Sequence, residues 1–456
     1  MADYKKVIEE IEDSLRDRES LKKNIWEWHK KHVLGVGLPE LGVAFESGEG
    51  VRVRDFEGKE YLDFMGQTLN VFVGHHHKKV IEAAIQQMEK LSFCTMLAAN
   101  EPKSKLAKLI NDITAEPLKM LYTVSGGSEA NESAMKLARR ARHKVGAYKF
   151  ISRLGAYHGA TFGACAATGL IMSKPVWVEP LPTGFVHVPL PYCYRCSFGK
   201  SYPDCEIECA RIIEQYIIQE GPEVYAGVIM EPILSAKGVI VPPKEYLKMV
   251  RDVCTRYGII LIFDEIVSGF GRTGKMFAYE YFDVVPDIMT LGKGMSSGYA
   301  AIAGMVVTEE LGKLGYAPNY HGFTMSGYPL ANAIAYANIQ VIIEENLVEN
   351  SAEVGEYFMG QLKELEKDFE VIGDVRGKGL LISIEIVQDK KSKVPDFEAA
   401  QKITDFCKEK GFLFHLNARG DTVNLLFSPP LCISKEDVDQ GIDILKQALS
   451  KFSRNY

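Results

Sequence analysis

Two short stretches decide the fold of this chain: Leu261-Ile262-Phe263-Asp264-Glu265 and Leu291-Gly292-Lys293-Gly294. The apolar run that leads into each of them is too short to cross a membrane and is typical of a strand buried on both faces of a parallel sheet. Side chains that follow the carboxyl ends of neighbouring parallel strands share one crevice. We therefore expect Asp264 and Lys293 to lie close together.

An acid and an amine in one crevice are typical of a pyridoxal 5'-phosphate site, where a lysine forms a Schiff base and an aspartate faces the pyridinium nitrogen. Such a site also needs a place for the phosphate. Ser125-Gly126-Gly127-Ser128 is a candidate, because a helical pattern starting at Ala130 follows it and a helix N-terminus attracts anions. An ordinary strand-to-helix turn with a serine cap has the same pattern, so this turn alone does not decide the function.

Length and composition indicate an enzyme with a small-molecule substrate. The 456 residues are enough for two or three lobes, and the net charge is -7 without a long basic run. Nucleic acids and anionic membranes are therefore not expected as partners. The N-terminus has no apolar stretch of signal-peptide length, and no window approaches the length of a membrane span. These features predict a cytoplasmic protein.

Hydrophobic patterns divide the chain into three segments, 1–75, 76–334 and 335–456. The first predicts a helix over 3–32, with its apolar side on the body of the protein, and then a hairpin around Glu57-Gly58. The second alternates strands and helices, so we expect an α/β fold with a mostly parallel sheet in a large domain. The third predicts a smaller α+β domain, with strands at 379–384, 412–414 and 423–427 and helices at 398–410 and 435–452.

Six motifs in the same order and spacing resemble the class III (omega) aminotransferases, which are pyridoxal phosphate enzymes of fold type I. The resemblance runs through most of the chain and implies a transaminase with a ping-pong, Schiff-base mechanism. The motifs are Ser125 to Glu132, Tyr157-His158-Gly159, Glu231-Pro232, Asp264 to Gly274, Lys293, and Thr324 to Pro329.

The resemblance implies a role for each matching residue. Lys293 resembles the Schiff-base lysine that also moves the proton, and Asp264 the acid that keeps the pyridine nitrogen protonated. Thr324 resembles a residue that reaches the phosphate from the neighbouring subunit, which implies a homodimer or a dimer of dimers. Tyr157 and Val267 resemble the residues on the two faces of the ring. The other expected cofactor contacts are Gly126, Gly127, Ser128, His158 as a supporting residue, and Glu231.

Departures from the family pattern bear on the substrate. Glutamate-linked members use a fixed arginine and a glutamate, which align here with Leu426 and Ala236. Arg419 aligns with the mobile arginine of pyruvate-linked members, whose planar fork can bind a carboxylate; an ordinary loop arginine within Asn417-Ala418-Arg419-Gly420 is the alternative. Leu69 aligns with an entrance tryptophan of several amine:pyruvate members. Arg139 matches an arginine that contacts distal acidic groups in some relatives, although a solvated or phosphate-proximal helix residue is an equal interpretation.

We expect an omega-amino acid or related amine of the taurine, beta-alanine or 4-aminobutyrate type as donor, and pyruvate or 2-oxoglutarate as acceptor. Alternatives within the family are 2,2-dialkylglycine decarboxylase and amino acid racemase chemistry. The missing fixed arginine at Leu426 argues against the decarboxylase. A non-catalytic binding protein on this fold would be expected to lack Lys293 or Asp264, and both are present.

Two further clusters lie outside this constellation, and neither is expected to supply a catalytic metal. Cys193, Cys196, Cys205 and Cys209 have the spacing of a tetrahedral zinc site, with free or reversibly oxidised thiols as the alternative. The run His75-His76-His77 is more typical of a helix cap and a solvated pair than of a ligand set.

Overall fold

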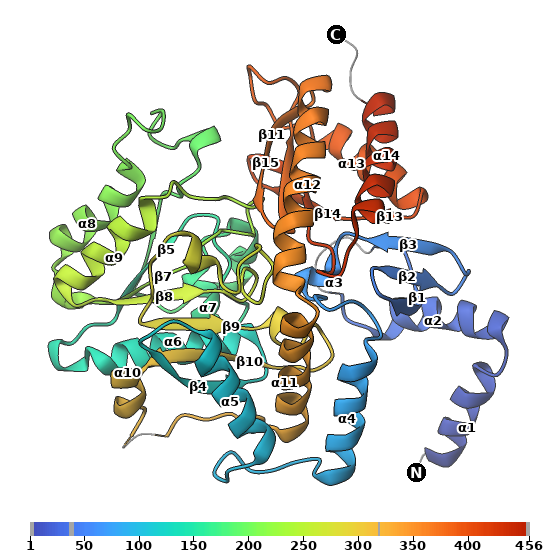
Figure 1. The fold of residues 1–456 in the computed structure, drawn as a ribbon, viewed down its shortest axis with the longest axis horizontal. Coiled ribbons are helices and arrows are strands. Elements are labelled where there is room, and N and C mark those ends of the chain that lie inside the picture. Colours follow the sequence, from blue (N-terminus) through green and yellow to red (C-terminus); the bar gives the residue numbers. More distant parts are fainter. Residues whose placement is uncertain (1–3, 36–40, 318–319, 453–456) are drawn as a thin grey trace.

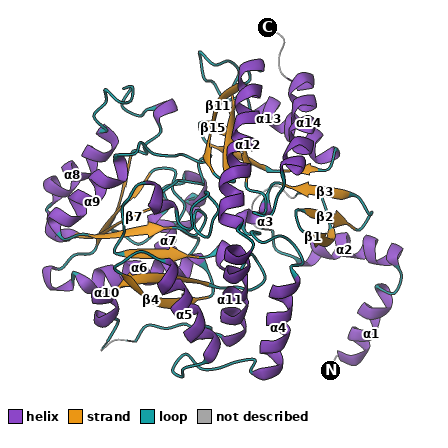
Figure 2. Cartoon of the chain, viewed as in Figure 1, coloured by secondary structure: helices purple, strands orange, loops and turns teal. Residues whose placement is uncertain are grey.

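The computed structural model describes residues 4–35, 41–317 and 320–452. A large lobe around one twisted sheet lies beside a smaller lobe whose helices α12 (Leu347–Asp368), α13 (Phe397–Glu409) and α14 (Lys435–Phe452) stand against a second sheet (Figure 1). Both lobes mix helices and strands (Figure 2). The α/β fold with a second, smaller α+β region is therefore as predicted.

The large sheet has seven strands in the order β4-β10-β9-β8-β7-β5-β6. All of its neighbours pair in parallel except β10, which is antiparallel to both β4 and β9. A mostly parallel sheet is thus confirmed. The strands are β4 (Leu118–Val124), β5 (Lys149–Arg153), β6 (Phe185–Val188), β7 (Tyr225–Met230), β8 (Ile260–Asp264), β9 (Ile288–Leu291) and β10 (Ala303–Thr308).

Helices cover this sheet. All residues of β7 are buried, as expected for a strand of a parallel sheet that is covered on both faces. Helix α6 packs across β10, β9 and β7, and α8 packs on α9. The helices of this lobe are α4 (Lys78–Lys90), α5 (Glu101–Ile113), α6 (Gly127–Ala141), α7 (Phe162–Ala167), α8 (Glu208–Glu220), α9 (Tyr246–Tyr257), α10 (Glu309–Leu314) and α11 (Pro329–Glu344). The short 3-10 helices are His143–Val145, Ile171–Ser173, Val176–Val178, Cys193–Arg195, Pro222–Val224, Ala278–Tyr281 and Lys293–Met295.

The smaller lobe holds an antiparallel sheet in the order β11-β12-β15-β14. Its strands are β11 (Ile372–Lys378), β12 (Leu381–Ile386), β14 (His415–Arg419) and β15 (Thr422–Phe427). The strands β12 and β15 and the helices α13 and α14 were predicted. The strands β11 and β14 were not, because polar residues interrupt their apolar pattern.

The N-terminal hairpin joins this smaller lobe. The strands β2 (Arg52–Asp55) and β3 (Glu60–Asp63) form the predicted hairpin. The strand β1 (Phe45–Glu49), which was not predicted, pairs antiparallel with β2, and β3 pairs in parallel with β13 (Phe412–Leu413). A short irregular turn, α3 (Gly66–Leu69), follows. This pairing brings residues from the two ends of the chain into one sheet.

The single N-terminal helix expected over 3–32 is wrong in two respects. The chain forms two helices, α1 (Tyr4–Ser14) and α2 (Arg18–His32), because the Asp17 side chain caps the second by accepting a hydrogen bond from the Ser20 amide. The apolar residues of α1 do not lie on the body. Ile8 is 60% exposed, and within the described chain α1 has no buried residue.

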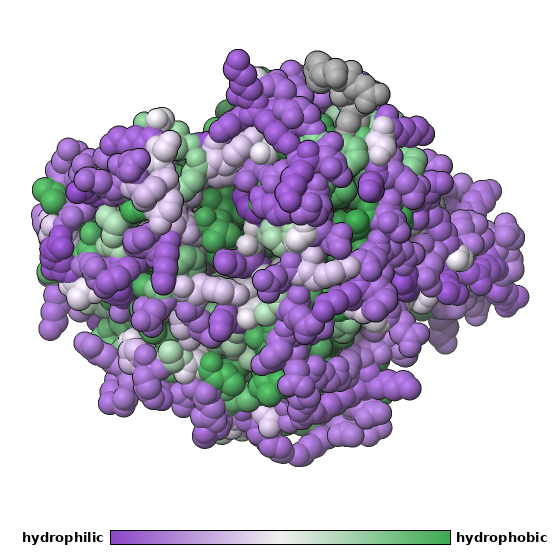
Figure 3. Space-filling view, turned by 45° about the horizontal axis from the view of Figure 1, so that its top comes forward, coloured by the Kyte–Doolittle hydropathy of each residue, from purple (hydrophilic) through white to green (hydrophobic). Residues whose placement is uncertain are grey.

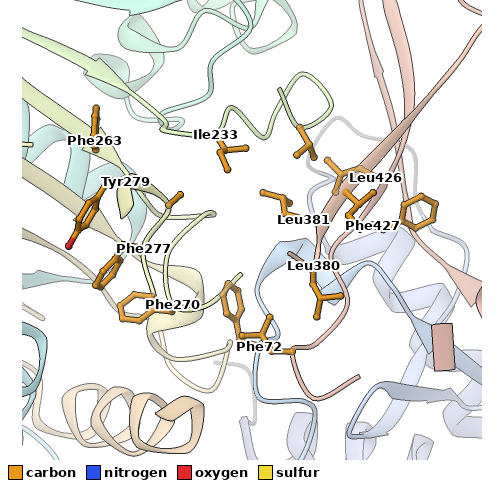
Figure 4. Close-up of a cluster of buried hydrophobic side chains, with 14 of the residues drawn as sticks. Phe72, Ile233, Phe263, Phe270, Phe277, Tyr279, Leu380, Leu381, Leu426 and Phe427 are labelled. Atoms are coloured by element: carbon orange, nitrogen blue, oxygen red, sulfur yellow. The ribbon is translucent and has the colours of Figure 1, made fainter. Parts of the chain in front are cut away.

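One apolar cluster spans the two lobes. Phe263 and Phe270 come from the large lobe, and Leu426 and Phe427 from β15, all buried in the same cluster (Figure 4). Hydrophilic side chains cover most of the face that Figure 3 shows. No helix in the described ranges is long and apolar enough to span a membrane.

Candidate active site

The pairing of β8 with β9 places the acid and the lysine together. Asp264, the last residue of β8, lies opposite Thr290 in β9, and the Glu265 amide donates to the Thr290 carbonyl over 3.0 Å. Lys293 follows two residues after β9 ends. The predicted arrangement at neighbouring strand ends is therefore confirmed.

The Asp264 carboxylate is buried and held by several donors. His158 Nδ1 lies 2.8 Å from Oδ2, and the Ile266 amide donates to Oδ1 over 3.2 Å. The side chain is 4% exposed, so these bonds replace the water that a charged carboxylate would otherwise hold. The acid has a fixed orientation before any ligand binds.

Asn131 is a third partner of the acid that the sequence analysis missed. Its Nδ2 donates to Asp264 Oδ2 over 2.8 Å and to the His158 carbonyl over 2.7 Å, and its Oδ1 accepts from Thr290 Oγ1 over 2.8 Å. The sequence offered one sign of this role: the side-chain amide of Asn131 lies on the alanine-rich face of α6, beside Ala130. A buried amide needs partners of this kind.

Lys293 occupies a strained and partly enclosed position. Its φ is +40°, and its Nζ donates to the Thr68 carbonyl over 2.8 Å. Burial lowers the pKa of the amine to about 8, while the Asp264 charge limits the decrease. The following Gly294 is needed because a Cβ there would lie 2.4 Å from the Phe72 ring.

The glycine-rich turn forms a tight N-terminus for α6, as predicted. The helix begins at Gly127. Its cap residue is Gly126, which has no side chain to accept a hydrogen bond from the first helix amides. A Cβ on Gly127 would lie 2.8 Å from Ile266 Cδ1, and a Cβ on Gly159 would lie 2.4 Å from Ser128 Oγ. Only glycines allow this close approach of backbone and hydroxyl, which leaves helix amides for an anion.

Glu231 supports the residue expected on the ring face. Its carboxylate accepts from the Tyr157 amide over 3.4 Å and from the Ser235 amide and hydroxyl over 2.8 and 2.9 Å. Burial raises the pKa of Glu231. The Tyr157 side chain is 44% exposed, which leaves its ring open to a ligand. Val267 packs partly buried against the central apolar cluster.

Arg419 ends β14 without the usual partner of a guanidinium. Its NH1 lies 3.7 Å from Met172 Sδ, and its Nε is buried without a hydrogen bond in the part of the chain that is described. None of the carboxylates in that part forms an ion pair with it, and burial lowers its pKa. A cation in this state gains strongly from an incoming anion.

Three other residues were expected to bear on the substrate. Leu426 is 3% exposed within β15 and belongs to the cluster in Figure 4. The Ala236 carbonyl accepts from Asn417 Nδ2 over 3.0 Å, which ties it to the Arg419 strand. Leu69 has a φ of +56° and packs partly buried on the central cluster, next to the Thr68 carbonyl that binds Lys293.

Two expected residues lie away from this group. Arg139 sits in the last turn of α6, at the opposite end from Gly127, where its Nε donates to the Tyr148 carbonyl over 3.1 Å. The structure does not bring it to Lys293. Thr324 is exposed on a turn before α11.

The cysteine and histidine clusters do not form metal sites in the described residues, where no group of three His, Cys, Asp or Glu side chains is arranged to hold an ion. The four cysteines are free thiols. His77 takes the cap position of α4, and His75 Nε2 lies 3.0 Å from Asp63 Oδ2.

The residues present fit pyridoxal phosphate. A buried, oriented acid, an amine with a lowered pKa and a glycine-rich helix N-terminus meet at one edge of the sheet. The His158 Nε2 atom is buried without a hydrogen-bond partner among the described residues. Each group matches one part of that cofactor: ring nitrogen, aldehyde and phosphate.

Comparisons with known proteins agree with a pyridoxal phosphate site. The model of the family "Aminotransferase class-III" matches residues 36–449. The aminotransferase YhxA of Bacillus subtilis is 38% identical over 88% of this chain and 91% of its own. A leucine/methionine racemase of Thermococcus litoralis and a taurine–pyruvate aminotransferase of Bilophila wadsworthia are each 36% identical over 88% of this chain, covering 89% and 91% of their own lengths.

A solved aminotransferase of Bacillus anthracis superposes with a TM-score of 0.90 at 35% identity, covering 94% of this chain and 99% of that one. Family match, sequence identity and fold agree over nearly the full length. The chain therefore belongs to the class III aminotransferases, a family of pyridoxal phosphate enzymes that act on amines and oxo acids.

Proposed function

We propose that this aminotransferase moves the amino group of an omega-amino acid or related amine, of the taurine, beta-alanine or 4-aminobutyrate type, to a 2-oxo acid such as pyruvate or 2-oxoglutarate. The observation that carries the proposal is Arg419, a half-buried guanidinium that has no acid partner among the described residues and whose Nε is buried without a hydrogen bond. The apolar Leu426 stands where glutamate-linked relatives have a fixed arginine. The similarity to a taurine–pyruvate aminotransferase also supports it.

Lys293 acts as the amine and the proton carrier of the reaction. When bound, pyridoxal phosphate supplies an aldehyde that takes the amino group and a ring that draws electrons from the reacting carbon. With a pKa of about 8, Lys293 Nζ is able to take a proton from one carbon and return it to another near neutral pH.

Asp264 holds a proton on the ring nitrogen by pairing with it. The contacts with His158 and Asn131 keep the carboxylate in a fixed orientation. The helix N-terminus at Gly126, Gly127 and Ser128 binds the phosphate. The open ring of Tyr157 stacks on one face of the cofactor, and Val267 packs on the other.

Arg419 recognises the carboxylate of the oxo acid. A planar fork binds such a group in a bidentate manner and can turn away when a neutral or cationic amine enters. Leu426 and Ala236 carry no charge at the two positions where glutamate-linked relatives have a fixed arginine and a glutamate. One mobile cation is therefore expected to serve both half-reactions.

The active site is completed by a second subunit. Thr324 is exposed in the single chain, where a phosphate contact across an interface is open to it. We include Thr324 of the partner subunit in the phosphate site and a homodimer, or a dimer of two such dimers, as the working assembly.

The purified protein tests this function directly. It should show a visible absorption band, and borohydride should fix the cofactor to Lys293. Taurine, beta-alanine and 4-aminobutyrate, added separately, should bleach the band, and pyruvate should restore it. Colourless protein that stays inert with added pyridoxal phosphate would exclude the enzyme function.

A racemase is the second candidate, because a leucine/methionine racemase has 36% identity to this chain. That activity would convert L-leucine to D-leucine with no oxo acid present, and chiral chromatography would detect it. Carbon dioxide release from a 2,2-dialkyl amino acid would instead indicate the decarboxylase branch.

A further inference from the structure

The turn that carries Arg419 is fastened to the large lobe. In the β14–β15 hairpin Arg419 pairs with Thr422, so only Gly420 and Asp421 form the turn. Gly420 has a φ of +66°, which suits this tight reversal. A two-residue turn reverses the direction of the backbone but makes no contact that holds the Arg419 side chain.

Lys237 of the large lobe supplies two bonds to this turn. Its Nζ donates to the Arg419 carbonyl over 3.3 Å and forms an ion pair with Asp421. The Lys237 side chain is only 16% exposed, whereas that of Asp421 is 74% exposed. The hydrogen bond from Lys237 to the Arg419 carbonyl is therefore largely shielded from water, and this shielding strengthens it.

The neighbours of Lys237 are also bound to the smaller lobe. Asn417 Nδ2 donates to the Ala236 carbonyl over 3.0 Å, and Arg376 Nε donates to the Gly238 carbonyl over 2.7 Å. Three consecutive residues thus bind the sheet that holds Arg419. The segment 236–238 acts as a rigid support for the hairpin.

The path of the lysine side chain is shaped by a glycine. Gly155, two residues before Tyr157, has a φ of +75°, and a Cβ there would lie 3.0 Å from Lys237 Cδ. A Cβ at position 155 would therefore crowd the stem of Lys237 on its way to the hairpin. The support therefore starts next to the expected ring-stacking residue.

The guanidinium itself is held much less firmly than its backbone. Its one polar side-chain contact in the described structure is the weak acceptor Met172 Sδ at 3.7 Å. A fixed backbone with a free side chain limits the positions that the fork can reach, and this reduces the entropy cost of binding a carboxylate.

We propose that Lys237 is a positioning residue for substrate recognition: its bonds to Asp421 and to the Arg419 carbonyl hold the backbone from which Arg419 reaches the substrate carboxylate. This rests on the proposed function of Arg419. Lys237 does not touch the substrate in this proposal. It determines the preference for carboxylate substrates over neutral ones.

The test is the variant Lys237→Met, which keeps the stem and removes both bonds. The KM for pyruvate should rise about tenfold, with kcat changed less than about twofold. The KM for an aliphatic aldehyde acceptor, which has no carboxylate, should stay unchanged. Lys237→Arg keeps a donor and should recover a KM for pyruvate within about threefold of the parent value.

Two matched controls separate positioning from general damage. Lys248→Met removes an exposed ion pair with Asp252 on α9 and should change neither KM. In the Arg419→Ala background, Lys237→Met should add nothing, because both act through one guanidinium. An equal rise in KM for pyruvate and aldehyde, or a further rise in that background, would overturn the proposal.

Two variants distinguish the carboxylate role of Arg419 from the positioning role of Lys237. If Arg419→Ala leaves the KM for pyruvate unchanged, the carboxylate role and the positioning role both fall. If Arg419→Ala raises that KM and Lys237→Met does not, only the positioning role falls. Should Lys237→Met not fold, Asp421→Asn removes the ion pair at an exposed position and should raise the KM for pyruvate about two- to fivefold; no change would then overturn the proposal.

Discussion

Asn131 Nδ2 donates a 2.8 Å hydrogen bond to Asp264 Oδ2, and this bond links helix α6 to the end of strand β8. The same helix begins at the glycine-rich turn expected to bind phosphate. The acid and the anion site are therefore parts of one rigid unit. A change at Asn131 should affect both cofactor binding and stability.

Asn131→Ala should lower the free energy of unfolding by about 1 to 3 kcal/mol, because it leaves the buried Asp264 and Thr290 short of a partner. Urea unfolding followed by circular dichroism measures this. Cofactor affinity should fall as well, seen by titration of the visible band. The control Asn24→Ala removes a bond to the Ser14 carbonyl near the surface and should leave the band unchanged; equal affinities in the two variants would contradict the link.

Recombination of the cofactor-free protein with pyridoxal phosphate should depend on pH through Lys293. Burial lowers the pKa of this amine to about 8, so its neutral, reactive form is reached well below the ordinary value of 10.5. The rate at which the visible band appears should rise with pH, with a midpoint near 8. A midpoint near 10.5 would show that the amine is solvated.

The same shift has a defined sign for stability. Between about pH 8 and 10.5 the unfolded chain binds more protons at this lysine than the folded chain. The free energy of unfolding of the cofactor-free protein should therefore gain a contribution that increases with pH across that window. Comparison with Lys293→Met, which has no titratable group there, isolates the contribution; identical pH profiles would disprove it.

Arg419→Ala should raise the KM for pyruvate about ten- to hundredfold, since a charged hydrogen bond contributes about 1.5 to 3 kcal/mol. The KM for a neutral amine donor should change little. Steady-state assays with each substrate varied in turn measure this. Arg54→Ala, which removes an exposed ion pair with Glu60, is the control.

Arg139→Ala tests the other arginine that the sequence suggested. Its Nε bonds the Tyr148 carbonyl at the far end of α6, so we expect a small loss of stability and unchanged KM values for donor and acceptor. A selective rise in the KM for an acidic donor would place this residue in the substrate site after all.

Gly294→Ala should destabilise the protein by about 1 to 3 kcal/mol, because its Cβ would lie 2.4 Å from the Phe72 ring. Thermal unfolding measures the effect. Gly360→Ala is the opposite control, since it meets open space inside helix α12 and should stabilise by about 0.5 to 1 kcal/mol. Equal effects of the two changes would rule out the packing explanation.

Elements with a continuous apolar pattern could be predicted from the sequence, whereas elements held by distant partners could not. Continuous apolar runs predicted β7, β8 and β9, because a strand buried on both faces excludes polar residues. The strand β14 was missed, since its polar residues alternate irregularly and it is held by pairing with β15. The helix α1 was wrongly expected to pack on the body. An amphipathic pattern predicts that one face of a helix is apolar but does not specify which surface covers that face.

The sequence by itself determined the family, the cofactor and the adjacency of Asp264 and Lys293, because motif spacing and strand pattern are local properties. The tertiary structure alone decided which residues orient the acid, and that Arg419 lacks an acid partner in the described chain while Lys237 fastens its backbone. Those facts depend on contacts such as Lys237 with Asp421, between residues 184 positions apart. Residues so distant in sequence meet only when the two lobes pack.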